Sequence, residues 1–99
     1  MTPKQIINDV ARYYGITPDE LIHGDRHRAF ADPRHVAAYC LHVRLGLCYS
    51  TIGRMLGGRC HATIIYAVNK VGDWMRLPQL NRNAATFISK LTDKTAVSN

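Results

Sequence analysis

The chain has 99 residues, of which 46% are hydrophobic, and a formal net charge of +6 at pH 7. This length predicts one compact domain over residues 1–92 with a flexible tail at 93–99, and it leaves too little chain for a nucleotide-hydrolysing core beside that domain. No apolar run approaches the roughly 20 residues of a membrane span, and the first residues lack a secretory segment, so we expect a cytoplasmic protein without membrane contacts. Three cysteines without a close pair predict reduced thiols.

The positive charge is concentrated in the middle of the chain. Residues 26–70 hold seven basic side chains and one acidic side chain, Asp32, whereas residues 1–25 hold two basic and four acidic ones. A concentrated basic segment is typical of proteins that bind a polyanion such as DNA, because neutralised phosphates release their condensed counterions. A solvated basic surface without a partner is the alternative that charge alone leaves open.

Two helices are predicted at the start of the chain. Thr2-Pro3-Lys4-Gln5 has the pattern of a capping box with proline at the first helical position, and Gly15 is expected to end the helix that follows. Thr17-Pro18-Asp19-Glu20 repeats this start signal. The second helix is therefore short and ends before Gly24.

A basic loop at residues 24–31 is expected to lead into the third helix. Asp32 before Pro33 is a favourable pair of helix cap and first helical residue, so this helix is predicted from about Pro33 to Leu45. A stripe of side chains at helical spacing is expected to face the core, formed by Val36, Tyr39, Cys40, Val43 and Leu47.

The second half of the chain has the sequence pattern of a helix-turn-helix. Residues Ser50 to Leu56 predict a short helix, and Gly57-Gly58 supply a turn with positive φ that lets the next helix begin at a steep angle. That helix is predicted from Cys60 to about Met75, and Pro78 separates it from a last helix at about Asn81 to Leu91. The fold class is therefore all-α, a compact helical bundle that contains a helix-turn-helix.

The helix predicted at residues 60–75 has two different faces. Its apolar stripe, with Trp74 near the edge, consists of Ile64, Ala67, Val68, Val71 and Met75. Its opposite face carries Ala62, Tyr66, Asn69 and Asp73. Small and polar side chains directly after a Gly-Gly turn suit a helix that enters the major groove of DNA. An ordinary helical bundle with a Gly-Gly corner is the alternative.

Residues 57–67, GGRCHATIIYA, resemble the signature GGRDHTTV-x-HA of the C-terminal DNA-binding domain of the DnaA replication initiators. Residues 10–16, Asp19-Glu20-Leu21, residues 31–37 and Ile52-Gly53 also fall in family order, so the resemblance covers roughly residues 5–91. It implies the fold type of the Trp repressor and the DnaA C-terminal domain. It also implies sequence-specific binding to double-stranded DNA, as in recognition of the DnaA box at a replication origin.

The resemblance further implies which side chains contact DNA. Arg26, in the basic loop, is expected to enter the minor groove, where a guanidinium suits a narrow region rich in A·T pairs. His61 and Thr63 match family residues, one touching bases and the other near the backbone, while Arg34 is positioned for phosphate and groove contacts. The complete expected set is Arg26, Arg28, Arg34, His35, Ser50, Arg59, Cys60, His61, Ala62, Thr63, Tyr66 and Lys70.

Three of these positions depart from the family pattern. Cys60 stands where the family has an aspartate that caps the recognition helix and helps to read bases, Ala62 replaces a threonine, and His35 replaces a glutamine. The base sequence recognised is therefore expected to differ from the usual box. The departures also leave open an alternative function, a DnaA-like domain that has lost base specificity and serves nonspecific DNA or protein contacts.

We expect no enzyme activity, no metal or other cofactor, and no bound nucleotide. Cys60 and His61 are neighbours in sequence and do not face each other on a helix, and catalysis would need a third, orienting group. The histidines and cysteines lack the spacing of a closed zinc site, and the G-x-x-x-x-G-K-[ST] phosphate motif is missing. His42 is expected on a helix surface and Cys48 in the core, while Trp74 is expected to pack rather than stack on bases.

The expected partner is double-stranded DNA at the nucleoid, bound by a monomer that reads one major groove and an adjacent minor groove. If the chain is a complete protein, these features favour a small DNA-binding regulator or accessory factor over an initiator.

Overall fold

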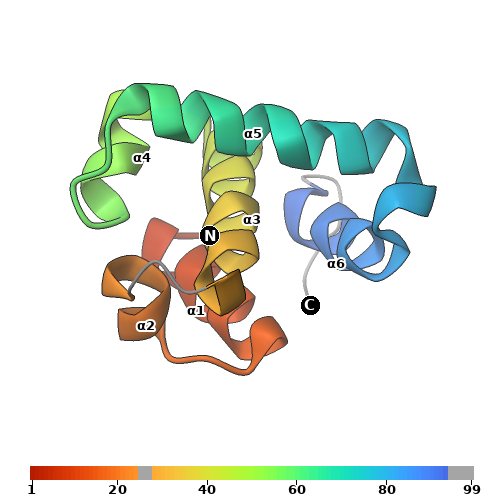
Figure 1. Cartoon of the computed structure of the whole chain (residues 1–99), viewed down its shortest axis with the longest axis horizontal. Coiled ribbons are helices and arrows are strands. Elements are labelled where there is room, and N and C mark those ends of the chain that lie inside the picture. The colour runs from red at the N-terminus through yellow and green to blue at the C-terminus, as the bar shows by residue number, and fades with distance from the viewer. Residues whose placement is uncertain (25–27, 94–99) are drawn as a thin grey trace.

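The computed structural model describes residues 1–24 and 28–93, and every regular element within these ranges is a helix (Figure 1). The expected all-α fold is therefore confirmed. Arg26 and the tail residues 94–99 lie outside the described residues. In chain order, the elements are α1 (Pro3–Tyr14), α2 (Pro18–His23), α3 (Arg28–Leu45), α4 (Tyr49–Met55), α5 (His61–Arg76), the short 3-10 helix η1 (Pro78–Leu80) and α6 (Arg82–Thr92).

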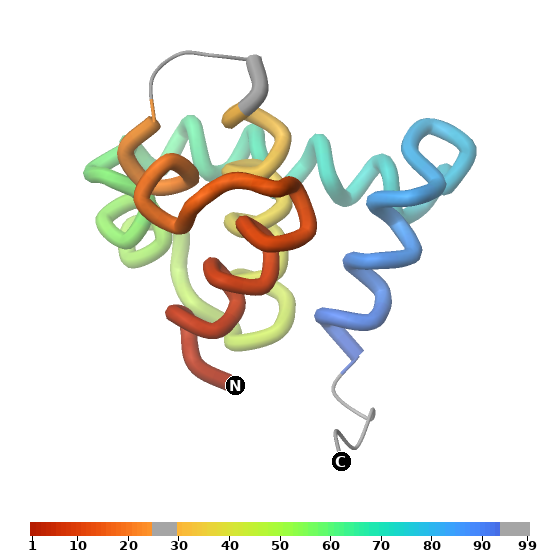
Figure 2. Tube along the Cα trace, turned by 90° about the horizontal axis from the view of Figure 1, so that it is seen from below, coloured from red at the N-terminus to blue at the C-terminus, as the bar shows by residue number. Residues whose placement is uncertain are grey.

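The long helix α3 is the centre of the bundle. It packs against α1, α5 and α6, and Figure 2 shows α1 lying in front of it. Helix α5 runs along one side of the molecule, with α4 at its beginning and α6 at its end (Figure 1). Because α5 is held at both ends, the direction in which it points is determined by the rest of the fold.

The start signals predicted for the first two helices are confirmed. The Gln5 N–H donates to Thr2 Oγ1 at 3.2 Å, and the Thr2 N–H donates to Gln5 Oε1 at 2.8 Å. Thr17 and Glu20 make the same reciprocal pair at the start of α2, at 2.9 and 3.0 Å. Each box satisfies two backbone N–H groups that a helix start leaves without a partner.

The predicted start of α3 is wrong, because the helix begins at Arg28 and contains Pro33 in its interior. Proline lacks an N–H and so removes one hydrogen bond of the helix. Two features support the extra turn. The ring of Phe30 packs on Gly24, where a Cβ would lie 2.6 Å from Phe30 Cδ2, and Pro33 itself is fully buried. Asp32 is therefore a residue inside the helix and not its cap.

Apolar side chains from all six α-helices meet in one buried core. Burying a large aliphatic side chain stabilises the fold by about 1.5–3 kcal/mol relative to leaving it exposed. The sulfur of Cys40 lies in this core, and burial raises the pKa of its thiol to about 12. Cys48 was also expected there, but that prediction is wrong: it is exposed and precedes α4 as its N-cap residue. The largest fully buried side chains are Ile6, Leu21, Leu41, Ile52, Leu56, Ile64 and Ile88.

Trp74 packs as expected, and a second aromatic contact joins α1 to α6. The Tyr13 ring stacks on Phe87 of α6 with centroids 4.1 Å apart, and Trp74 is buried with 8% of its surface exposed. Met75 is only partly buried, so Trp74 rather than Met75 belongs to the fully buried stripe of α5. This end of α5 packs against η1 and α6, which widens its buried face beyond the predicted stripe.

Candidate nucleic-acid interface

The turn between α4 and α5 closes directly onto α4. Gly57 and Gly58 have φ values of 89° and 79°, which side-chain-bearing residues rarely adopt. The N–H groups of Gly58 and Arg59 both donate to the Gly53 carbonyl oxygen, each at 2.9 Å. This predicted helix-turn-helix corner is therefore present and tightly closed.

The same corner rests on the end of α2. A Cβ on Gly57 would lie 2.6 Å from the Ile22 carbonyl oxygen, and Nη2 of Arg59 donates to that oxygen at 3.3 Å. Arg59 is partly buried, and its Nε has no hydrogen-bond partner in the described part of the chain. The corner thus has fixed contacts to two neighbouring helices, and these set the angle at which α5 leaves it.

Helix α5 presents one buried face and one exposed face. Ile64 and Val71 are buried beneath it, whereas His61, Ala62 and Tyr66 are exposed on its outer side. Tyr66 has 60% of its surface exposed. The outer face continues to Asn69, a turn beyond Tyr66, which helical spacing could have added to the expected set.

The first residue before α5 is Cys60, in the extended backbone conformation of an N-cap (φ −72°, ψ 156°). Its side chain makes no capping hydrogen bond, and its Sγ lies 3.2 Å from Thr63 Oγ1. The hydrogen bond from Thr63 holds the pKa of the Cys60 thiol below its ordinary value. Because the first turn of α5 has no acidic side chain, the positive end of its helix dipole is not neutralised locally.

Arg34 ties the beginning of α3 to the end of α2. Its Nε donates to the Leu21 carbonyl oxygen at 2.9 Å, and its Nη2 donates to the Gly24 carbonyl oxygen. These bonds give Arg34 a structural task that the sequence did not predict. Its expected contact with a phosphate stays a prediction.

Four of the expected residues surround one small pocket of about 80 Å³ between α3 and α5. Burial is the main reason that the pKa of His35 lies below its ordinary value, and the positive charges of Lys70 and Arg34 lower it further. His35 is therefore neutral at neutral pH. The expected residues around the pocket are Arg34, His35, Arg59 and Thr63.

The remaining expected residues are partly outside this group. Ser50 is exposed in the first turn of α4, and Lys70 is partly buried on α5. Arg28 begins α3, but its side chain, like the whole of Arg26, lies outside what the structure describes. The structure therefore leaves the predicted minor-groove contact untested.

A model of the family described as "Bacterial dnaA protein helix-turn-helix" matches residues 3–71 of the chain. The chain belongs to this DnaA family. The resemblance predicted from the sequence is therefore confirmed. The DnaA helix-turn-helix is a DNA-binding module, which fits the exposed outer face of α5.

Three DnaA proteins illustrate the relationship, each named chromosomal replication initiator protein. The protein of Thermomicrobium roseum is 36% identical over 76 residues, and that of Lactococcus lactis is 37% identical over 76 residues, in both cases 77% of this chain. The protein of Corynebacterium jeikeium is 31% identical over 96 residues, which is 95% of this chain. The matched stretch covers only 16%, 17% and 16% of these relatives, respectively.

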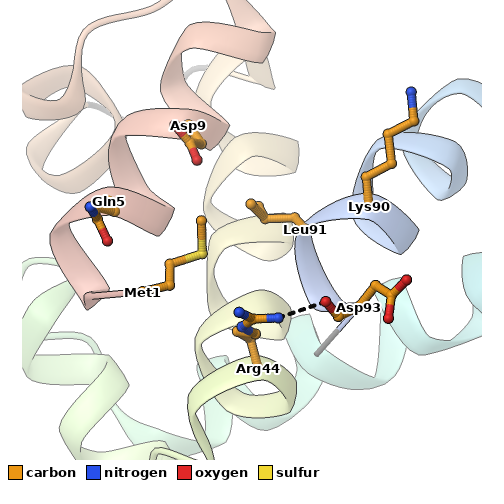
Figure 3. Close-up of a pocket in the computed structure, with 7 residues that line it drawn as sticks. All are labelled: Met1, Gln5, Asp9, Arg44, Lys90, Leu91 and Asp93. Carbon is orange, nitrogen blue, oxygen red and sulfur yellow. Dashed lines mark hydrogen bonds between the residues drawn. The ribbon is translucent and has the colours of Figure 1, made fainter. Parts of the chain in front are cut away.

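A larger cavity of about 420 Å³ lies away from this DnaA-type corner, between the starts and ends of other helices (Figure 3). Arg44 donates there to the backbone oxygen of Asp93 at 2.7 Å and so joins the ends of α3 and α6. Neither a thiol nor an imidazole lines this cavity, whose walls are Met1, Gln5, Asp9, Arg44, Lys90, Leu91 and Asp93.

Two kinds of feature are absent from the part of the chain that the structure describes. Within residues 1–24 and 28–93, no group of three or more histidine, cysteine, aspartate or glutamate side chains is arranged to hold a metal ion. None of the helices in these ranges combines the length and the apolar character that crossing a membrane requires.

Proposed function

We propose that this domain binds double-stranded DNA with a preference for sequence, by placing the outer face of α5 in the major groove. The observation that carries the proposal is that α5 exposes His61, Ala62 and Tyr66 on its outer face. The turn that precedes α5 is hydrogen-bonded to the carbonyl oxygens of Gly53 and Ile22. A recognition helix needs both features, because side chains can read base edges only when the helix is held at a fixed angle.

The basic central segment supports the electrostatic part of the proposal. Arg34 and Arg59 have their guanidinium groups fixed beside the corner by backbone carbonyls, and Lys70 lies further along α5. Positive charge at these places favours DNA phosphates. Arg26 completes the proposal as the side chain that enters the adjacent minor groove, with Arg28 near the phosphates.

We further propose that the bound site is short, asymmetric and related to the DnaA box. The relatives are named chromosomal replication initiator proteins, and this domain corresponds to less than a fifth of each of those compared above. A monomer reading one major and one minor groove has no reason to prefer a palindrome. The biological role in this proposal is recognition of such sites at the chromosome, in replication initiation or its regulation.

A second function follows from three departures at reading positions, namely Cys60, Ala62 and His35. A thiol accepts hydrogen bonds poorly, and alanine offers only a methyl group. If these changes remove base discrimination, the domain binds DNA without preference or contacts another protein.

Selection of bound duplexes from a random DNA pool at moderate salt tests the proposal. We expect one short, non-palindromic motif, and the affinity for it should fall steeply with salt, with a log–log slope of about −0.9 per neutralised phosphate. His61→Ala should lose preference within the major-groove half of the motif and serves as the matched variant. Enrichment of no motif would favour the second function, and palindromic sites with half-sites one helical turn apart would indicate a dimer.

A further inference from the structure

A histidine and a tyrosine from two different helices meet at the edge of the proposed DNA-binding face. The rings of His35, on α3, and Tyr66, on α5, lie with their centroids 5.7 Å apart and their planes at 73°. His35 is partly buried, and its Nδ1 is enclosed without a hydrogen-bond partner among the described residues. Tyr66 is the opposite case, since 60% of its surface faces solvent.

We propose that His35 is a positioning residue for Tyr66, which it holds at a fixed angle so that the tyrosine determines the preference at one base pair. The inference rests on the proposed function, and it names a pair of side chains through which the preference would be set. The ligand group would be a base edge in the major groove, such as a thymine methyl against the ring or an acceptor for the phenol O–H.

The physical argument concerns the freedom of an exposed aromatic side chain. A tyrosine with most of its surface in solvent has several rotamers, and one that points into a groove loses that freedom on binding. An edge-to-face contact between aromatic rings contributes about 0.5–1.5 kcal/mol, which favours one arrangement by about twofold to twelvefold. His35 is itself held by burial, so it can provide such a contact before DNA arrives.

Burial and the charged groups around His35 keep its imidazole neutral at neutral pH, so the ring that contacts Tyr66 carries no charge. Arg34 and Asp32 lie on its own helix, Lys70 faces it from α5, and Arg59 lines the same pocket from the corner. Burial and then Lys70 lower the pKa of His35 most, Asp32 raises it, and Arg34 lowers it by a smaller amount than Asp32 raises it. Protonation would place a third positive charge beside Lys70 and Arg34, so the Tyr66 contact should change only in acid.

The test is a double-mutant cycle of His35 and Tyr66, in which the measured quantity is the preference for one base over the others at each position of the DNA site. His35→Ala and Tyr66→Ala should each reduce discrimination at the same base pair by about threefold to tenfold, and the double variant should lose no more than Tyr66→Ala alone. His35→Phe keeps an aromatic edge and cannot be protonated. It should restore the preference and remove the pH dependence that His35 causes at that base pair below pH 6.5, its ordinary pKa.

His61→Ala is the matched control, because it removes a second histidine, one that is exposed on the outer face of α5. It should change a different base pair and leave the pH response at the Tyr66 position intact. Losses that add in the double variant, or that fall at different base pairs, would overturn the positioning role. Thermal unfolding of each variant checks that the domain remains folded.

A measurement without DNA separates this inference from the proposed function. In the free protein, the NMR signals of the Tyr66 ring should shift with the titration of His35 and stop shifting in His35→Phe. If they shift but the wild-type domain prefers no sequence, the proposed function fails, and the contact is structural only. If they do not shift, the positioning role is wrong even when DNA binding is sequence-specific.

Discussion

Gly53 and Arg59 are in direct backbone contact across the helix-turn-helix corner. The Arg59 N–H donates to the Gly53 carbonyl oxygen at 2.9 Å, and a Cβ on Gly53 would lie 2.2 Å from the Arg59 carbonyl oxygen. Even a methyl group therefore has no room at position 53. The corner therefore depends on the missing side chain at position 53 of α4 as much as on the positive φ values of Gly57 and Gly58.

Gly53→Ala should destabilise the domain by about 2–4 kcal/mol, because the clash is with backbone that is bonded to α4. Urea unfolding measures the change. Gly72→Ala is the control, since a Cβ at Gly72 would meet its nearest neighbour, Arg76 Nη1, at an ordinary 3.5 Å. That variant should instead gain about 0.5–1 kcal/mol from the higher helix propensity of alanine. Equal effects of the two substitutions would contradict this account of the corner.

Cys60→Asp should stabilise the domain by about 0.5–2 kcal/mol, because a carboxylate at the N-cap of α5 can accept from the first-turn N–H groups that the thiol leaves uncapped. It should also shift base preference toward the usual DnaA box, since a carboxylate can accept from cytosine N4. Its negative charge should weaken nonspecific binding. Denaturant unfolding and binding to the box and to a scrambled duplex measure these effects.

Cys48→Asp is the matched control for Cys60→Asp. Cys48 is also an N-cap without a capping hydrogen bond, at the start of α4, and its Sγ faces Thr51 Oγ1 at 3.1 Å. We expect a similar gain in stability and no shift in preference between the two duplexes. If Cys60→Asp changes neither stability nor preference, Cys60 is neither cap nor reader.

Cys40 should make the domain lose stability in alkali. Burial raises the pKa of its thiol from 9.0 to about 12, so the folded state holds a proton that the unfolded chain releases. The stabilising contribution is complete below pH 9.0 and falls by about 1.4 kcal/mol per pH unit as the pH rises toward 12. Burial raises the pKa of Tyr14 as well, with the same sign. The prediction therefore concerns the difference between wild type and Cys40→Ala, which should shrink as the pH rises over this interval; a constant difference would refute it.

Arg26→Ala should weaken DNA binding by about 1–3 kcal/mol and relax the preference for A·T pairs at one end of the site, if the side chain enters the minor groove. Competition binding with duplexes changed at single positions measures both effects. Arg82→Ala removes the same charge at the start of α6 and should reduce affinity only slightly, equally for all sequences. Unchanged preference in Arg26→Ala would remove Arg26 from the interface.

Local signals in the sequence predicted the elements whose geometry depends on local contacts. Thr2 with Gln5 and Thr17 with Glu20 form capping boxes whose partners are only three residues apart, and both appear as predicted. The Gly57-Gly58 turn is equally local. These patterns were sufficient for the all-α fold and for the helix-turn-helix.

The features that the sequence did not predict depend on contacts between distant segments. The first turn of α3 is supported by Phe30 on Gly24 and by Arg34, whose Nε is bonded to the Leu21 carbonyl thirteen residues away. Neither contact is visible before α2 and α3 are placed side by side. The same limit applies at the interface, where the sequence gives Arg59 a positive charge but not its bond to the Ile22 carbonyl.

Pro33 divides α3 into two mechanically different parts. Behind it, the helix is a continuous hydrogen-bonded ladder in the core, whereas the turn before it contacts Gly24 through the Phe30 side chain. Side-chain attachments can break and re-form without opening a backbone ladder, so local opening of this turn costs less free energy than opening the core.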